Sequence, residues 1–215
     1  MNPAARRRSA RPLPAHPFKP LPAAFFAADT VAVARALLGV VLVSDSPQGR
    51  TAGRIVETEA YLCDDGACHA SRGPTDRNRA MFGPAGRSYT YLIYGMYHCF
   101  NVVTAAKGVG EAVLIRALEP LQGLELMARR RGSDTPLALC SGPGKLVIAL
   151  GIGSLPNGSD LRKGPLVLVP PGAYPPSGGA AAQGNIKVTT RIGITKDEHL
   201  PLRFYLEGSP WISRK

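Results

Sequence analysis

The chain has 215 residues, of which 45% are hydrophobic and 19% charged, so it is long enough to bury a core, and disorder throughout is excluded. Its net charge of +11 favours a polyanionic partner, either nucleic acid or an anionic membrane surface. Residues 1–20 contain five basic residues and no acidic one, which leaves +6 for the remainder. The body of the protein is therefore basic in its own right.

Targeting and cysteine patterns narrow the class of protein. No segment resembles a transmembrane span, and the arginine-rich start is followed by proline-rich sequence instead of the apolar stretch of a secretory signal. We therefore expect a cytoplasmic protein. Cys63, Cys68, Cys99 and Cys140 are too few for a disulfide scaffold and too scattered for a paired zinc motif. Cys63, Cys68 and His69 suggest a metal, but structural roles are the simpler interpretation, and we expect no metal.

The first elements in chain order are a tail, a helix and two strands. Residues 1–20 are rich in Arg, Ala and Pro without apolar periodicity, which predicts a disordered or loosely docked tail. Asp29-Thr30 can cap a helix that runs through Leu38 and stops at Gly39. Strands rich in β-branched residues are predicted to follow, beginning at 40–43 and then at 54–61.

A loop and a hairpin come next. Segment 71–87 contains two Gly-Pro pairs and four arginines, so we interpret it as a basic surface loop. Two β-rich runs, 88–93 and 96–103, flank Tyr94-Gly95, a pattern typical of a β-hairpin.

The second half is predicted to mix strands and helices. A strand is expected over 112–118, a helix starting at Glu119-Pro120 and ending at the arginines 129–131, and a second helix over 143–150. Residues 153–184 are rich in Gly and Pro, which predicts irregular structure with one strand at 166–169. Further strands are predicted at 186–194 and 202–206. The pattern predicts an α+β single domain around a curved antiparallel sheet.

One strand carries candidate catalytic chemistry. Alternation along 55–61 places Glu57, Glu59 and Tyr61 on one face with Ile55. A carboxylate in such a position can act as a general base if it reaches a water molecule. The alternative is a solvated sheet face, which an isolated strand of this composition would favour.

Aromatic residues cluster in the predicted hairpin. Tyr89, Tyr91, Tyr94, Tyr97 and Phe100 fall in one short stretch of a chain that is only 7% aromatic. Ordinary core packing explains Tyr89 and Tyr97 equally well, whereas Tyr94 lies at the turn and is exposed unless a partner receives it. Side chains wedged into the minor groove unstack bases, and an enzyme acting on a base must remove that base from the stack. A hairpin-borne Tyr94 suits both needs.

Arg116 interrupts the apolar run 112–118. An unpaired buried guanidinium is costly, so we expect Arg116 to find a carboxylate, either Glu59 or Glu57. Such a pair is purely structural in one interpretation; in the other, Arg116 also helps to hold a water molecule against Glu59.

Together these segments resemble the alkyladenine (3-methyladenine) DNA glycosylases of the mammalian-type family, which is also widespread in bacteria. The matching stretches run in order from about residue 20 to the C-terminus. They are 54–61 (RIVETEAY), 69 with 72–73, 75–82 (TDRNRAMF), 91–101 (YLIYGMYHCFN), 114–123 (LIRALEPLQG), 139–145 (LCSGPGK) and 202–213 (LRFYLEGSPWIS). The resemblance implies a bacterial member, with a fold like the formyltransferase C-terminal domain and a protruding hairpin. Residues 153–184 match poorly.

The resemblance also implies roles for individual residues. Glu59 deprotonates the water that attacks C1′ of the deoxyribose, Arg116 positions that water, and Tyr94 intercalates in place of the flipped nucleotide. The base-binding pocket has three stacking walls and one residue that crowds a guanine 2-amino group. The walls are Tyr61, His69 and Tyr91, and the crowding residue is Asn101.

The implied activity is monofunctional hydrolysis of the N-glycosidic bond of alkylated or deaminated purines in base excision repair. Substrates of this class are 3-methyladenine, 7-methylguanine, hypoxanthine and ethenoadenine. No lysine nucleophile and no metal or redox cofactor is implied. His98 and Phe100 depart from the family pattern, and His98 leaves the substrate range open.

DNA contacts outside the pocket are predicted at Arg77, Arg79 and Lys145, which can bind phosphates, although each alone also fits a solvated surface cation. The arginines 129–131 fit charge complementarity at a helix end. We expect residues 21–215 to form a monomeric glycosylase domain that associates with the nucleoid through DNA. The alternatives are a non-catalytic nucleic-acid-binding module, which has no need of Glu59, and a small-molecule enzyme, which gains nothing from an exposed Tyr94.

Overall fold

One curved antiparallel sheet organises the molecule. The computed structural model describes residues 17–93, 95–153, 155, 157–174 and 184–214. Within these residues the sheet has eight strands, all paired antiparallel. They are β1 (Val41–Ser46), β2 (Gly49–Tyr61), β3 (Ser88–Ile93), β4 (Tyr97–Val103), β5 (Ala112–Gln122), β6 (Leu166–Val169), β7 (Ile186–Thr189) and β8 (Arg203–Leu206).

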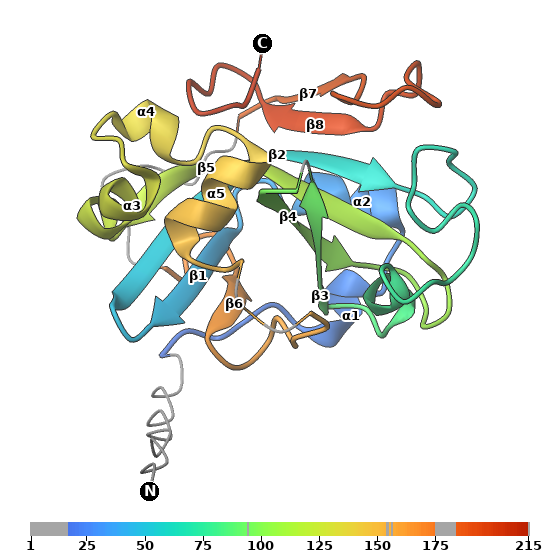
Figure 1. Ribbon diagram of the computed structural model, residues 1–215, viewed down its shortest axis with the longest axis horizontal. Coiled ribbons are helices and arrows are strands. Elements are labelled where there is room, and N and C mark those ends of the chain that lie inside the picture. The colour runs from blue at the N-terminus through green and yellow to red at the C-terminus, as the bar shows by residue number, and fades with distance from the viewer. Residues whose placement is uncertain (1–16, 94, 154, 156, 175–183, 215) are drawn as a thin grey trace, which may run out of the picture.

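The long strand β2 is the centre of this sheet (Figure 1). β5 pairs along one of its edges, and β4 and β3 continue the sheet beyond β5. On the other edge, residues 49–54 pair with β1 and residues 57–59 pair with β8, so the sheet branches at the middle of β2. The branch brings the C-terminal strands against the part of β2 that carries Glu57 and Glu59.

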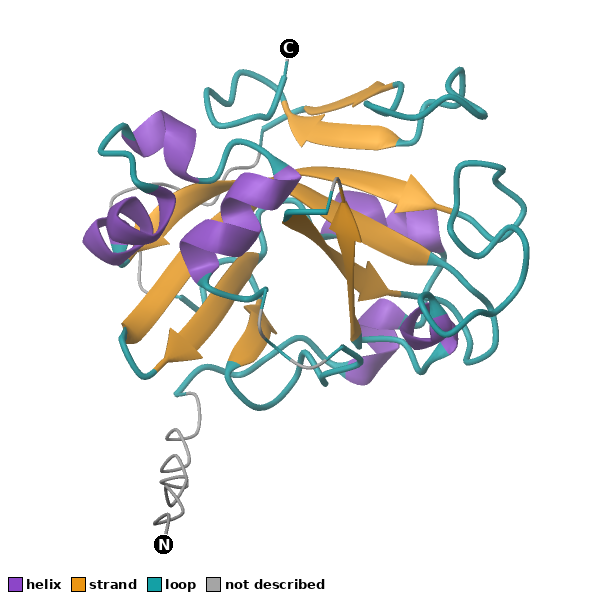
Figure 2. Ribbon diagram, in the orientation of Figure 1, coloured by secondary structure: helices purple, strands orange, loops and turns teal. Residues whose placement is uncertain are grey.

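Short helices and one large apolar cluster complete the α+β fold, which the sequence predicted correctly (Figure 2). The helices are α1 (Ala23–Phe26), α2 (Thr30–Ala36), α3 (Leu124–Arg131), α4 (Pro136–Leu139) and α5 (Pro143–Leu150), with a 3₁₀ turn η1 (Arg79–Phe82). Asp29 caps α2 by accepting the Ala32 N–H at 2.8 Å. Apolar residues of α2, α5 and the sheet belong to the same buried cluster. No helix in the described ranges is long and apolar enough to cross a bilayer.

The helix predicted over 119–131 ends at the arginines as predicted, but its start at Glu119-Pro120 is wrong, because α3 begins at Leu124. Both residues belong to β5, where Glu119 lies opposite Arg54 and accepts a hydrogen bond from its guanidinium at 2.9 Å. Pro120 lies opposite Gly53 beside an irregularity in the register, where a missing N–H is tolerated. Gly123, with φ of 77°, turns the chain into α3. Tertiary pairing with β2 outweighs the local helix signal.

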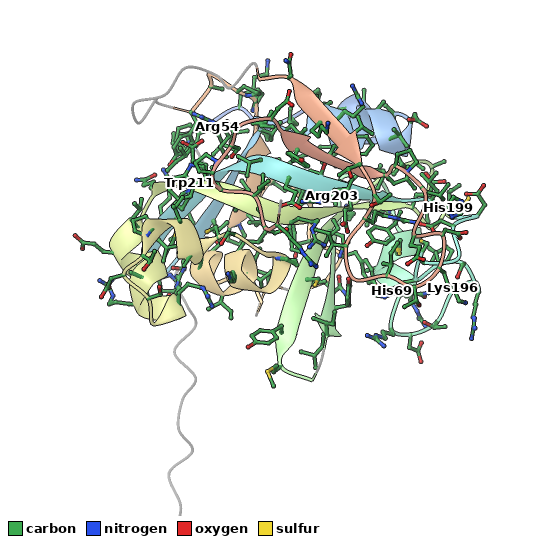
Figure 3. The ribbon with its side chains drawn as sticks, turned by 90° about the horizontal axis from the view of Figure 1, so that it is seen from above. Arg54, His69, Lys196, His199, Arg203 and Trp211 are labelled. Carbon is green, nitrogen blue, oxygen red and sulfur yellow. The ribbon has the colours of Figure 1, made fainter. Side chains whose placement is uncertain are left out.

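One strand end and two short helices also differ from the prediction. The strand predicted over 186–194 ends at Thr189, because the following residues leave the sheet and pass over the candidate site. The short helices α1 and α4 lack the apolar periodicity that predicts helices. The hairpin of β3 and β4 is observed as predicted and projects from the body of the protein (Figure 3).

Candidate active site

A pocket of about 760 Å³ opens at the base of the β3–β4 hairpin. Several parts of the chain converge on it, among them the end of β2 with the loop after it, the hairpin, β5, the end of α3, the start of α5, and the segment 192–196 before β8. Aromatic side chains form much of its lining. All four residues predicted to form a base-binding pocket line it, namely Tyr61, His69, Tyr91 and Asn101.

Glu59 lies immediately behind this lining and is fully buried. Its Oε2 accepts hydrogen bonds from the Tyr61 hydroxyl at 2.9 Å and from Arg116 Nη1 at 3.2 Å, and both of these donors line the pocket. Its Oε1 accepts the backbone N–H of Ile192 at 2.8 Å. The alternative of a solvated sheet face is therefore wrong for this strand, since Glu57 is fully buried as well.

Arg116 reaches the carboxylates because β5 is irregular at this point. The register between β2 and β5 skips Val56 on one strand and Arg116 on the other. An extra residue of this kind bends a strand and re-aims its side chain. Arg116 thereby contacts both carboxylates, Nε to Glu57 Oε1 and Nη1 to Glu59 Oε2, each at 3.2 Å. The sequence left open whether Arg116 pairs with Glu57 or with Glu59, and in the structure it pairs with both.

The electrostatics suit a carboxylate that can accept a proton. Burial raises the pKa of Glu59 above the ordinary value of 4.5, although the Arg116 charge and the hydrogen bonds from Ile192 and Tyr61 act in the opposite direction. Burial, followed by the Glu59 charge, raises the pKa of Tyr61, so its hydroxyl stays protonated and donates to Glu59. Burial disfavours the Arg116 charge, but Glu59 and Glu57 raise its pKa overall.

The aromatic wall is built by two neighbouring elements. The His69 ring contacts the Tyr91 ring edge-on, with centroids 4.4 Å apart, and the Tyr89 hydroxyl lies 2.8 Å from His69 Nδ1. Burial and the nearby charge of Arg77 lower the pKa of His69, which keeps its imidazole neutral at physiological pH. Burial raises the pKa of Tyr89 to about 12. The wall is therefore uncharged and can lie against a cationic ring without repelling it.

Asn101 contributes a polar edge to the same pocket. It is buried on β4, and its Nδ2 donates to the Tyr89 carbonyl oxygen at 3.0 Å. This bond to the neighbouring strand fixes the amide plane. Asn101 therefore presents a rigid polar group to whatever enters between the rings.

Comparison with known proteins places the chain in a family. Residues 24–210 match the model of the family described as methylpurine-DNA glycosylase (MPG). The chain belongs to the methylpurine-DNA glycosylase family. Relatives from Methanoculleus marisnigri and Carboxydothermus hydrogenoformans are 58% and 47% identical, in each case over 91% of this chain and 99% of the relative. Both carry the name "Putative 3-methyladenine DNA glycosylase".

Membership makes this chain a DNA glycosylase of base excision repair, and the resemblance found from the motifs is confirmed. A family match over most of the chain fixes the class of reaction. The roles of the individual pocket residues depend on their geometry.

Basic side chains surround the pocket of this methylpurine-DNA glycosylase. Arg77 and Lys145 line it, and Arg77 also donates to the Leu92 carbonyl oxygen at 3.0 Å. Arg79 is highly exposed and pairs with Asp76 outside the lining. Arg131 and Lys196 line the pocket too, although the sequence assigned Arg131 only to a helix end and did not single out Lys196. No periodicity marks either residue, because the fold alone brings them to the site.

Tyr94, the predicted intercalating residue, lies outside the described residues. Its hairpin neighbours Leu92, Met96 and Tyr97 are exposed, at 43%, 67% and 42% of their surface. Large apolar side chains are thus accessible to a partner near the turn.

Sequence reasoning missed the residues that contact Tyr61 and Glu57 on the side away from the pocket. Arg191 is buried, pairs with Asp65, and lies 4.7 Å from the centre of the Tyr61 ring. Ser213 and Arg203 donate to Glu57. These contacts join residues far apart in the chain, so local pattern carries no signal for them. Within the described part of the chain, no cluster of three or more His, Cys, Asp or Glu side chains could hold a metal ion.

Proposed function

We propose that this glycosylase hydrolyses the N-glycosidic bond of alkylated or deaminated purines that are flipped into the pocket, with Glu59 as general base. The observation that carries the proposal is the buried Glu59, which lies between Arg116 and Tyr61 directly behind an aromatic pocket. A water held between Arg116 and Glu59 attacks C1′ and transfers a proton to Glu59. The C1′–N bond breaks, and its electron pair leaves with the purine.

The pocket accounts for the class of base. Tyr61, His69 and Tyr91 stack on the purine, and a cationic alkylpurine gains about 0.5–2 kcal/mol from each electron-rich ring that it faces. Neutral His69 adds no repulsion to such a base. Asn101 lies at the purine edge, where it crowds the 2-amino group of guanine. The substrates we propose are 3-methyladenine, 7-methylguanine, hypoxanthine and ethenoadenine.

The hairpin and basic residues in and around the pocket lining hold the DNA. Tyr94 takes the place of the flipped nucleotide, and Arg77, Arg79 and Lys145 contact phosphates. Residues 21–215 act as a monomeric glycosylase domain in the cytoplasm, and residues 1–20 add positive charge. The reaction ends at the abasic site without strand cleavage, since it uses water as the nucleophile and requires no lysine.

The first prediction tests the role of Glu59. Glu59→Gln keeps the shape of the side chain but removes the proton acceptor, so single-turnover base release should fall about 10²–10⁴-fold while affinity for damaged duplex is retained. Release is measured on duplexes that carry each of the four lesions. Reactions run with and without alkali separate base loss from strand cleavage.

Glu119→Gln is a matched control, because it removes a carboxylate that pairs with an arginine across the same two strands, away from the pocket. Its release rate should equal that of the unaltered protein. Unchanged release by Glu59→Gln would exclude Glu59 as the base. Binding of the damaged duplexes by the unaltered protein, with no release of any of the four bases, would favour the non-catalytic binding module.

A further inference from the structure

Arg116 divides its hydrogen-bond donors between two carboxylates. An arginine facing one carboxylate usually donates two parallel N–H bonds to it. Here Nε donates to Glu57 and Nη1 donates to Glu59, each at 3.2 Å. Nε and Nη2 also donate to the Ser213 hydroxyl, at 3.4 and 3.3 Å. Glu59 therefore receives a single N–H from Arg116, and something must prevent the two-bond arrangement.

Glu57 is the group in a position to prevent it. It is fully buried, and its Oε1 accepts Arg203 Nε at 2.7 Å and the Ser213 hydroxyl at 2.9 Å, besides Arg116 Nε. Its Oε2 accepts the Ser213 backbone N–H at 2.5 Å. Donors from β5, β8 and the C-terminal segment thus hold this anion in place. Figure 3 shows Arg203 near the centre of the molecule, at the root of the hairpin.

Glu57 has no place in the chemistry itself. It does not line the pocket, and its donors surround both of its oxygens. A carboxylate so placed can act only through its neighbours, of which Arg116 is the one that also touches the pocket lining and Glu59.

We propose that Glu57 is a positioning residue that withholds one N–H donor of Arg116 from Glu59 and so preserves Glu59 as a proton acceptor. The proposal rests on the proposed function only in giving Glu59 the role of base. The arrangement itself is a group of two carboxylates and two guanidiniums in which Arg116 pairs with both Glu57 and Glu59, and Arg203 pairs with Glu57.

The charges around Glu59 fix the direction of the effect. The Glu59 carboxylate is faced by titratable, charged and donor groups from several elements. They are Tyr61 and Glu57 from β2, Arg116 from β5, Arg203 from β8, Tyr91 from β3, Cys99 from β4, and Arg191 with the Ile192 N–H from the segment before β8. Glu57 is the other carboxylate of this group, and it raises the pKa of Glu59. Neutralising Glu57 removes that repulsion and frees the Arg116 guanidinium to turn and place a second N–H on Glu59. Both changes favour the ionised form of Glu59 and make it a weaker base.

The test is the titration of Glu59 in Glu57→Gln, followed by the ¹³C signal of its side-chain carboxyl in the intact protein without DNA. The midpoint should move to lower pH by about one unit, since loss of a neighbouring charge changes a pKa by this order. In the pH profile of the single-turnover release rate, the acid limb should move with the midpoint, and the plateau rate should fall about ten-fold. Glu119→Gln, which removes a half-buried carboxylate of the same β2–β5 ladder, should leave midpoint and limb in place.

Arg203→Gln provides an independent arm if Glu57→Gln does not fold. Loss of Arg203 leaves Glu57 to attract Arg116 more strongly, so the Glu59 midpoint should move to higher pH, opposite to Glu57→Gln. A midpoint that stays in place in every folded variant would overturn the proposal, even if the rate falls through general destabilisation. Because the titration needs no turnover, it is separate from the Glu59→Gln assay, whose failure would remove the proposed base and leave the titration result standing.

Discussion

The Arg191 side chain shows how single buried contacts hold the site together. Its guanidinium donates to Asp65 and to the Ala60 carbonyl oxygen, and its cation lies against the Tyr61 ring. The next residue, Ile192, gives its N–H to Glu59. One arginine therefore fixes a pocket wall, the loop after β2 and a donor to the candidate base.

A prediction for single residues concerns Asp65→Asn. The pair is almost completely buried, so loss of the carboxylate leaves a buried cation poorly compensated and should lower the free energy of unfolding by about 3–5 kcal/mol. Urea denaturation measures the change. Asp76→Asn is the control, because its pair with Arg79 is exposed and should contribute little. Equal effects of the two substitutions would contradict a special role for the buried pair.

At the scale of elements, the β3–β4 hairpin combines a rigid root with an exposed tip. Tyr89 and Asn101 are buried where the hairpin joins the sheet. Nearer the turn, Tyr97 lies so close to Gly144 at the start of α5 that a β-carbon on Gly144 would meet it at 3.2 Å. The tip carries exposed Leu92 and Met96. The root therefore fixes the pocket lining, while the tip is free to meet DNA.

The hairpin prediction is that Tyr94→Ala weakens base flipping. Loss of the wedge costs stacking with the opened duplex, and each 1.4 kcal/mol lowers the flipping equilibrium about ten-fold. The fluorescence change on binding a 1,N6-ethenoadenine duplex reports the flipped base. Tyr94→Phe keeps the ring and should retain the signal. An unaltered change in Tyr94→Ala would count against the wedge.

For the whole molecule, charge converges on the pocket from separate parts of the chain. Arg77 precedes η1, Arg131 ends α3, Lys145 lies in α5, and Lys196 precedes β8, yet all four line one pocket. These residues concentrate part of the net charge of +11 around the pocket, which favours a polyanion there. Segment 1–20 contains five further basic residues.

The prediction at this scale is that deletion of residues 1–20 flattens the salt dependence of DNA binding. The segment holds five cations, and each phosphate contact contributes about 0.9 to the slope of log K against log salt, so the slope should decrease by up to about 4.5. Fluorescence anisotropy with duplex DNA at several salt concentrations measures it. An identical slope would show that the segment does not touch DNA.

The sequence by itself determined the α+β class, the hairpin, most strand positions and the family, because these depend on local alternation, turn residues and an ordered set of motifs. It also singled out Glu59, Arg116 and the pocket aromatics. The tertiary structure decided that Glu119 continues a strand, that Arg116 contacts both glutamates, and that Arg191, Arg203 and Ser213 support them. Those features depend on strand register, an irregular ladder and contacts between distant segments, which no local pattern of residues encodes.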